Sequence, residues 1–152
     1  MTDAAPIEPV AIPALLRAAR GTYAIAIRER LIEAGFDDMP RNAPFVLGGM
    51  ANRRGSIAGL IRELDVSKQA ASQLIDTLVV RGYLSRDVDP DDRRRMSIAL
   101  TERGLAAATA VREGVADIDA RLAEVCGPRQ IAGLRAGLIA LRQIRQQLGA
   151  PD

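Results

Sequence analysis

The sequence predicts a mainly α-helical fold that contains one small β-hairpin. Over several long segments, apolar residues recur at steps of three and four, as they do on one face of a helix. Two short segments around a turn rich in Asp and Arg instead alternate apolar and polar residues, which is typical of paired, half-buried strands. Aromatic residues make up only 3% of the chain, so the core has to be built from packed aliphatic helices.

The N-terminal part of the chain is expected to contain a flexible tail and a long helix. Residues 1–11 are rich in Pro and lack an apolar period, which is typical of a tail, whereas residues 12–152 are expected to form a single domain. The apolar period predicts a helix from about Ile12 to Ala34, and Gly35 followed by Phe36 is a typical helix stop. A short helix is predicted from about Pro44 to Met50.

Two helices joined by a tight connection are predicted in the middle of the chain. The first runs from about Ser56 to Leu64, and Asp65-Val66 forms the connection. The second begins after Ser67, a good N-cap, and runs to Arg81, with Gly82 in a position that favours a left-handed conformation. Together with the hairpin that follows, this arrangement predicts a winged helix-turn-helix over residues 43–101.

The hairpin is predicted from its alternation and from the residues of its turn. Leu84, Arg86 and Val88 alternate in the first strand, and Met96, Ile98 and Leu100 alternate in the second. The segment between them contains Asp-Pro-Asp-Asp. These residues favour a turn because Pro fixes φ and Asp side chains bond back to the nearby backbone. Three consecutive arginines, residues 93–95, complete the tip.

Long amphipathic helices are predicted at both ends of the domain. After Thr101, which is expected to act as a cap, one helix runs to about Cys126, and a last helix follows from about Arg129 to Leu148. A lone helix cannot bury such an apolar stripe, so we expect residues 12–35 and 102–148 to pack against a second copy of the chain. The residues expected in this dimer interface are Leu15, Leu16, Leu134, Leu138, Leu141 and Ile144.

The composition argues against an enzyme and against a metal or cofactor site. The chain has no His, which is the commonest general base and transition-metal ligand, and its single Cys cannot build a cysteine zinc site. It also lacks a phosphate-binding Gly loop and a convergent pair of carboxylates. No signal pattern or long apolar run is present, so a cytoplasmic protein without membrane contact is expected. Because the net charge is only +2, affinity for nucleic acid has to come from local placement of charge.

Residues 56–104 resemble the MarR family of bacterial transcriptional regulators. The resemblance lies in the run LDVSKQAASQLIDTLVVRGYLSR, in the DxR pair of Asp92 and Arg94, and in the LTERG sequence at 100–104. The chain departs from the family at Asp65, where Gly is usual. The resemblance implies a homodimer that is held by its first and last helices and binds a pseudo-palindromic DNA operator, with repression relieved by a small ligand.

The candidate DNA-binding residues lie on the helix that follows Ser67 and at the tip of the hairpin. The first turns of that helix are short and polar, as a major groove requires. In the tip, Asp92 is expected to orient Arg94 toward a narrow minor groove. The full set is Ser67, Lys68, Gln69, Ala71, Ser72, Gln73, Asp92, Arg93, Arg94 and Arg95. The alternative is a winged-helix module that binds protein or coats DNA without ligand control, its charge run being a solvated turn.

An effector pocket is expected between the first long helix, the short helix and the start of the helix after Thr101. Tyr23, Phe45 and Met50 are either lining residues of this pocket or ordinary core residues. The candidate partners for an anionic aromatic ligand are Arg17, Arg20 and Arg54. Cys126 ends an apolar stripe and is interpreted as a small buried hydrophobe, not as a redox sensor.

Overall fold

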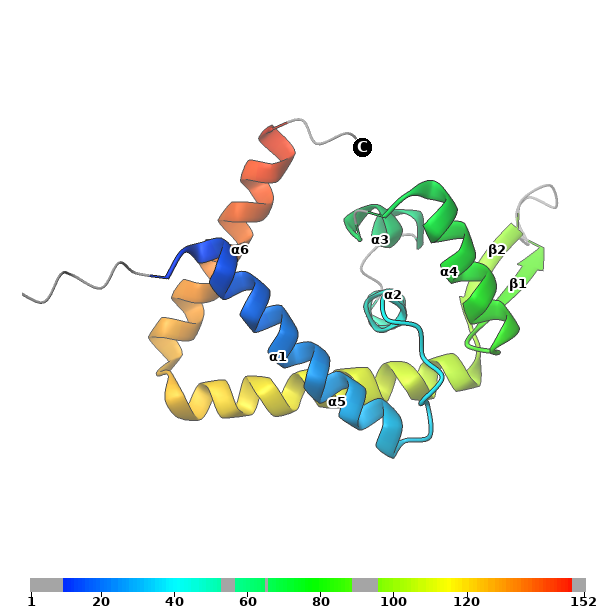
Figure 1. The fold of residues 1–152 in the computed structure, drawn as a ribbon, viewed down its shortest axis with the longest axis horizontal. Helices are drawn as coiled ribbons and strands as arrows, with labels where there is room; N and C mark the ends of the chain where they lie inside the picture. The colour runs from blue at the N-terminus through cyan, green and yellow to red at the C-terminus, as the bar shows by residue number, and fades with distance from the viewer. Residues whose placement is uncertain (1–9, 53–56, 65, 89–95, 149–152) are drawn as a thin grey trace, which may run out of the picture.

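The computed structural model describes residues 10–52, 57–64, 66–88 and 96–148. Within these ranges the chain forms six helices and one antiparallel hairpin, which confirms the predicted mainly α fold. Figure 1 shows that α1 crosses α5 and that α5 joins a lobe, formed by α2, α3, α4 and the hairpin, at its beginning to α6 at its end. The elements are α1 (Ile12–Glu33), α2 (Ala43–Ala51), α3 (Ile57–Glu63), α4 (Lys68–Val80), β1 (Leu84–Val88), β2 (Met96–Leu100), α5 (Glu102–Val125) and α6 (Pro128–Gln147).

The most extensive packing in the chain is between α1 and α5, which cross closely. Small residues make this close approach feasible, because Gly114 of α5 lies against the backbone of Ala26 and Ile27 in α1. An ion pair between Arg30 Nε and Asp117 Oδ2, at 2.7 Å, joins the same two helices. The helix pair therefore forms a scaffold to which the lobe is attached.

Local signals in the sequence define the helix ends. The Ser67 hydroxyl accepts the Ala70 N–H at 3.2 Å, and the Thr101 hydroxyl accepts the Gly104 N–H at 3.0 Å, as expected of N-caps. Gly35 and Gly82 have φ of 81° and 74°, so both take the left-handed conformation that ends α1 and α4.

The core of the protein lies between the lobe and the first half of α5, and it includes Leu31 of α1. Val46 and Leu47 of α2, Leu78 of α4, and the adjacent pair Tyr83 and Leu84 are its largest fully buried side chains. Leu84 pairs with Leu100 across the hairpin, and the register continues to Val88 opposite Met96. The hairpin is thus anchored to the core at its base. Among the described residues, no helix combines the length and hydropathy needed to span a bilayer.

Candidate nucleic-acid interface

The first two turns of α4 present a polar surface to solvent. Lys68, Gln69, Ser72 and Gln73 are all exposed, and Ser67 is exposed at the cap position. Short amide and hydroxyl side chains hydrogen-bond base edges, and a Lys ammonium binds phosphate. The structure therefore brings five of the sequence-predicted residues together on one accessible surface, although the Ser67 hydroxyl already caps the helix.

Ala71 does not belong to this surface. Its exposed fraction is only 8%, and it faces the core with Ile75 and Leu78, which are 5% and 0% exposed. Residues separated by four and then three positions share one face of a helix, so Ala71 necessarily follows the buried stripe. Of the residues of α4 that were predicted to contact a groove, Ala71 is therefore the one that the structure buries.

An ion pair joins the polar face of α4 to the hairpin. Arg86 Nη2 in β1 donates to Asp76 Oδ1 in α4, and both side chains are about half exposed. The Asp76 carboxylate would repel a phosphate, and the neighbouring guanidinium offsets its negative charge. The sequence did not reveal this pair because only the packing of α4 against β1 brings the two residues together.

The tip of the hairpin lies outside the described residues, so its assignments remain predictions from the sequence. They concern Asp92, Arg93, Arg94 and Arg95. Arg54, a candidate ligand partner, lies outside the described residues as well.

The structure gives two of the expected pocket residues another role. The Tyr23 hydroxyl donates to Asp119 Oδ1 at 2.5 Å, so this side chain links α1 to α5. That hydrogen bond, together with burial, raises the pKa of Tyr23 to about 12, which keeps the phenol protonated as a donor. Met50 packs against the core cluster. The remaining candidates, Arg17, Arg20 and Phe45, are exposed and do not line the two cavities described next.

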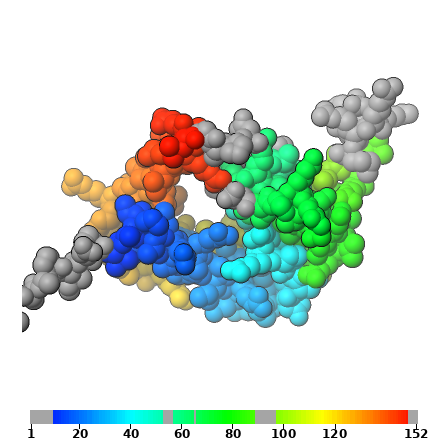
Figure 2. Space-filling model, turned by 45° about the horizontal axis from the view of Figure 1, so that its top comes forward, coloured from blue at the N-terminus to red at the C-terminus, as the bar shows by residue number. Residues whose placement is uncertain are grey.

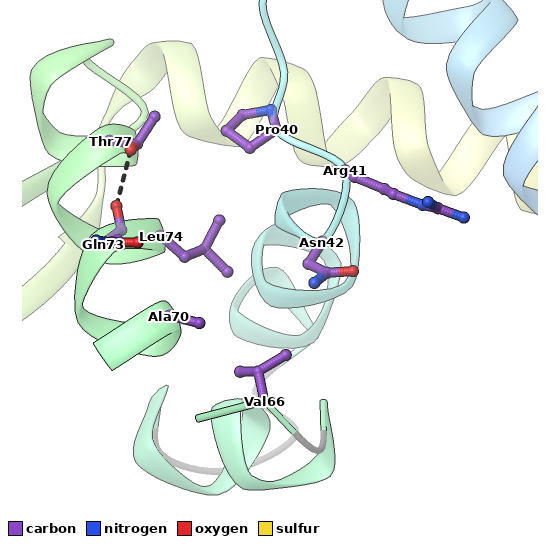
Figure 3. Close-up of a pocket in the computed structure, with 8 residues that line it drawn as sticks. All are labelled: Pro40, Arg41, Asn42, Val66, Ala70, Gln73, Leu74 and Thr77. Atoms are coloured by element: carbon purple, nitrogen blue, oxygen red, sulfur yellow. Dashed lines mark hydrogen bonds between the residues drawn. The ribbon is translucent and has the colours of Figure 1, made fainter. Parts of the chain in front are cut away.

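A cavity of about 220 Å³ lies between α4 and the segment that leads into α2. Figure 3 shows Leu74 and Ala70 of α4 pointing toward Pro40, Asn42 and Val66 across this space. Its position differs from the expected pocket, which was placed between α1, α2 and α5. The eight lining residues are Pro40, Arg41, Asn42, Val66, Ala70, Gln73, Leu74 and Thr77.

A second cavity, of about 380 Å³, lies at the elbow between α5 and α6. Half-buried Cys126 lines it together with apolar residues and Arg135. In the described part of the chain, no three His, Cys, Asp or Glu side chains are grouped as a metal site requires.

Part of the chain is similar to a known protein family. Residues 37–95 match the model of the MarR family. Among curated proteins, none matches the sequence significantly.

Solved structures resemble this fold over almost the whole chain. MepR of S. aureus in complex with DNA has a TM-score of 0.69 at 17% identity, covering 89% of this chain and 98% of MepR. The reduced form of MarR from E. coli has a TM-score of 0.66 at 21% identity, covering 88% and 98%. MepR bound to ethidium bromide has a TM-score of 0.55 at 18% identity, covering 88% and 96%. The family match runs from α2 to β1, which is less than half of the chain, and these three solved structures, at 17–21% identity, share the fold of the flanking helices as well.

Proposed function

We propose that this protein is a homodimeric, sequence-specific DNA-binding repressor. The observation that carries the proposal is the exposed polar surface at the start of α4, next to the hairpin. A helix of this kind reads base edges in the major groove, and a hairpin beside it reaches the adjacent minor groove. The solved complex of MepR with DNA supports this use of the fold.

Exposed apolar side chains on the terminal helices support a homodimer. None of the described residues of α6 is buried, and Leu134, Leu138 and Leu141 are 49%, 41% and 42% exposed. Leu15 and Leu16 of α1 are exposed as well, and Figure 1 and Figure 2 both show the beginning of α1 beside α6, away from the hairpin. A second copy that covered these stripes would remove them from water and would place two α4 helices on one face of DNA, ~34 Å apart.

A footprinting experiment tests the proposal. Genomic fragments selected by the protein should contain a short inverted repeat, and the protein should protect that repeat from cleavage. Because phosphate contacts release counterions, log K should fall linearly with log salt, by about 0.9 for each phosphate contact. Equal affinity for the selected repeat and for a scrambled duplex at physiological salt would favour an architectural DNA-coating module over a regulator.

We further propose that a small aromatic anion relieves repression by occupying the cavity beside α4. Pro40, Val66 and Leu74 provide an apolar lining, and Arg41 contributes to the rim while its guanidinium extends away from α4. A ligand at this place lies next to Gln73, so it would compete with insertion of α4 into the groove. MepR has been solved with the aromatic compound ethidium bromide, which supports ligand binding on this fold.

A panel of phenolic acids is expected to weaken operator binding of the wild-type protein by ~1–3 kcal/mol at saturation. The Asn42→Trp variant fills the cavity from the side opposite α4 and should lose this response, while Asn52→Trp, at the exposed end of α2, should retain it. Peroxide-induced release that disappears in Cys126→Ser, with no response to any acid, would instead identify a thiol switch.

A further inference from the structure

Four side chains meet where the lobe joins the scaffold, and the proposed DNA contacts do not include any of them. Phe36 and Asp38 come from the loop between α1 and α2, Tyr83 precedes β1, and Arg103 lies in the first turn of α5. These four residues are called the junction cluster below. Tyr83 is fully buried, whereas the Arg103 and Asp38 side chains are 42% and 40% exposed.

Arg103 contacts every other member of the junction cluster. Its guanidinium carbon lies 4.6 Å from the centre of the Tyr83 ring and 5.3 Å from that of Phe36, distances typical of cation–π contacts. Its Nη2 donates to Asp38 Oδ1 at 3.2 Å and to the Tyr83 hydroxyl oxygen at 3.1 Å. The Tyr83 hydroxyl in turn donates to Asp38 Oδ1, which closes the network.

The backbone of Tyr83 ties the same cluster to α4 and α5. Its N–H donates to the Leu78 carbonyl at 2.9 Å, which completes the end of α4. Its carbonyl accepts the Thr101 N–H at 3.2 Å and the Thr101 hydroxyl at 3.1 Å, and Thr101 caps α5. Tyr83 and its partners therefore connect four parts of the chain, which are the end of α4, the base of the hairpin, the loop after α1 and the start of α5.

The network keeps a single protonation state at neutral pH. Burial and the hydrogen bond to Asp38 raise the pKa of Tyr83 to about 12, so its phenol stays protonated. The same hydrogen bond, assisted by Arg103, lowers the pKa of Asp38, so its carboxyl stays ionised. The hydrogen bonds and the ion pair of the junction cluster therefore persist around neutral pH, and the cluster does not act as a pH switch there.

We propose that Arg103 is a positioning residue for DNA recognition, which holds α4 and the hairpin at a fixed angle to the α1–α5 scaffold. The inference rests on the proposed function, because a fixed angle matters when two lobes of a dimer have to fit one operator. Tyr83 is held in the core by its own burial, so loss of Arg103 should leave the lobe folded. What is lost is the planar cation that connects the Tyr83 ring and Asp38 to α5.

The Arg103→Met variant, studied in the full-length protein, tests this role. We expect its operator affinity to fall about tenfold, with its affinity for random duplex, its salt slope and its dimer unchanged. Asp38→Asn should weaken operator binding in the same way, and the double variant should lose no more than the larger single loss. Arg103→Lys keeps the charge and loses the flat stacking surface, so it should fall between wild type and Arg103→Met. Arg112→Met, an exposed change on the same helix, is the matched control and should bind as wild type does.

Three results would overturn the inference. A salt slope reduced by about one, with equal loss on operator and random duplex, would make Arg103 a direct phosphate contact. Wild-type affinity of Arg103→Met would show that it has no role, and a loss that parallels thermal destabilisation would show a purely structural one. If the wild-type protein itself does not distinguish operator from random duplex, the proposed function fails first, and the inference fails with it.

Discussion

Replacing Gly114 with Val should force α1 and α5 apart and destabilise the protein by at least about 3 kcal/mol. A Cβ atom at position 114 would lie 2.7 Å from the Ile27 Cα, 2.9 Å from its N, and 3.0 Å from the Ala26 carbonyl oxygen. These are backbone atoms of the opposing helix, so no change of rotamer relieves the overlap. Gly114→Ala carries the same Cβ and should cost about 1–3 kcal/mol.

The test depends on whether Gly114→Ala lowers or raises the stability of the protein. Alanine in a helix interior normally stabilises a protein by about 1 kcal/mol relative to glycine. Gly21→Ala in α1, where an added Cβ would meet nothing within 4 Å, should show that ordinary gain. Urea unfolding that follows helical content provides the measurement, with the midpoint reporting stability and the slope reporting the surface exposed on unfolding. A stabilised Gly114→Ala variant would contradict the close crossing of α1 and α5.

Helix and strand boundaries were predictable because the interactions that fix them are local in the chain. Ser67 and Thr101 each bond to a backbone N–H three residues further on, so the cap and its partner stand together in the sequence. Gly35 and Gly82 end their helices because a left-handed residue is needed there, and Gly adopts it without steric cost. The strands were found by the same logic, since alternation is a property of consecutive residues.

Features that depend on how distant segments pack were missed or misplaced. Ala71 is an exception, because the apolar period of α4 already placed it in the buried stripe. The hydrogen bond from Tyr23 to Asp119 could not be predicted, because it depends on how α1 and α5 cross. Without that partner, Tyr23 was interpreted as a pocket or core residue. The junction cluster draws on residues 36 to 103 and has no sequence signature of its own, since each member is an ordinary loop or helix-end residue.

The largest effect on DNA binding is expected from Leu138→Asp in α6. Leu138 is 41% exposed in the single chain and lies on the stripe proposed to pack against a second copy. An unpaired carboxylate in an apolar seam costs several kcal/mol unless it is protonated or reaches water. The variant should therefore be a monomer at micromolar concentration, and a monomer engages only one half-site. Loss of the second, intramolecular binding event should weaken operator affinity by about 10²–10⁴-fold.

Sedimentation and operator titration of the same samples separate this loss from unfolding. Because no described residue of α6 is buried in its own chain, Leu138→Asp should keep wild-type helical content and a folded lobe. Ala136→Asp adds the same charge on the opposite side of α6, so it is the matched control and should remain a dimer. A Leu138→Asp protein that still sediments as a dimer, or a wild-type protein that is already monomeric, would show that the exposed stripe of α6 does not join two copies. In that case the two-fold arrangement of α4 helices would need another interface.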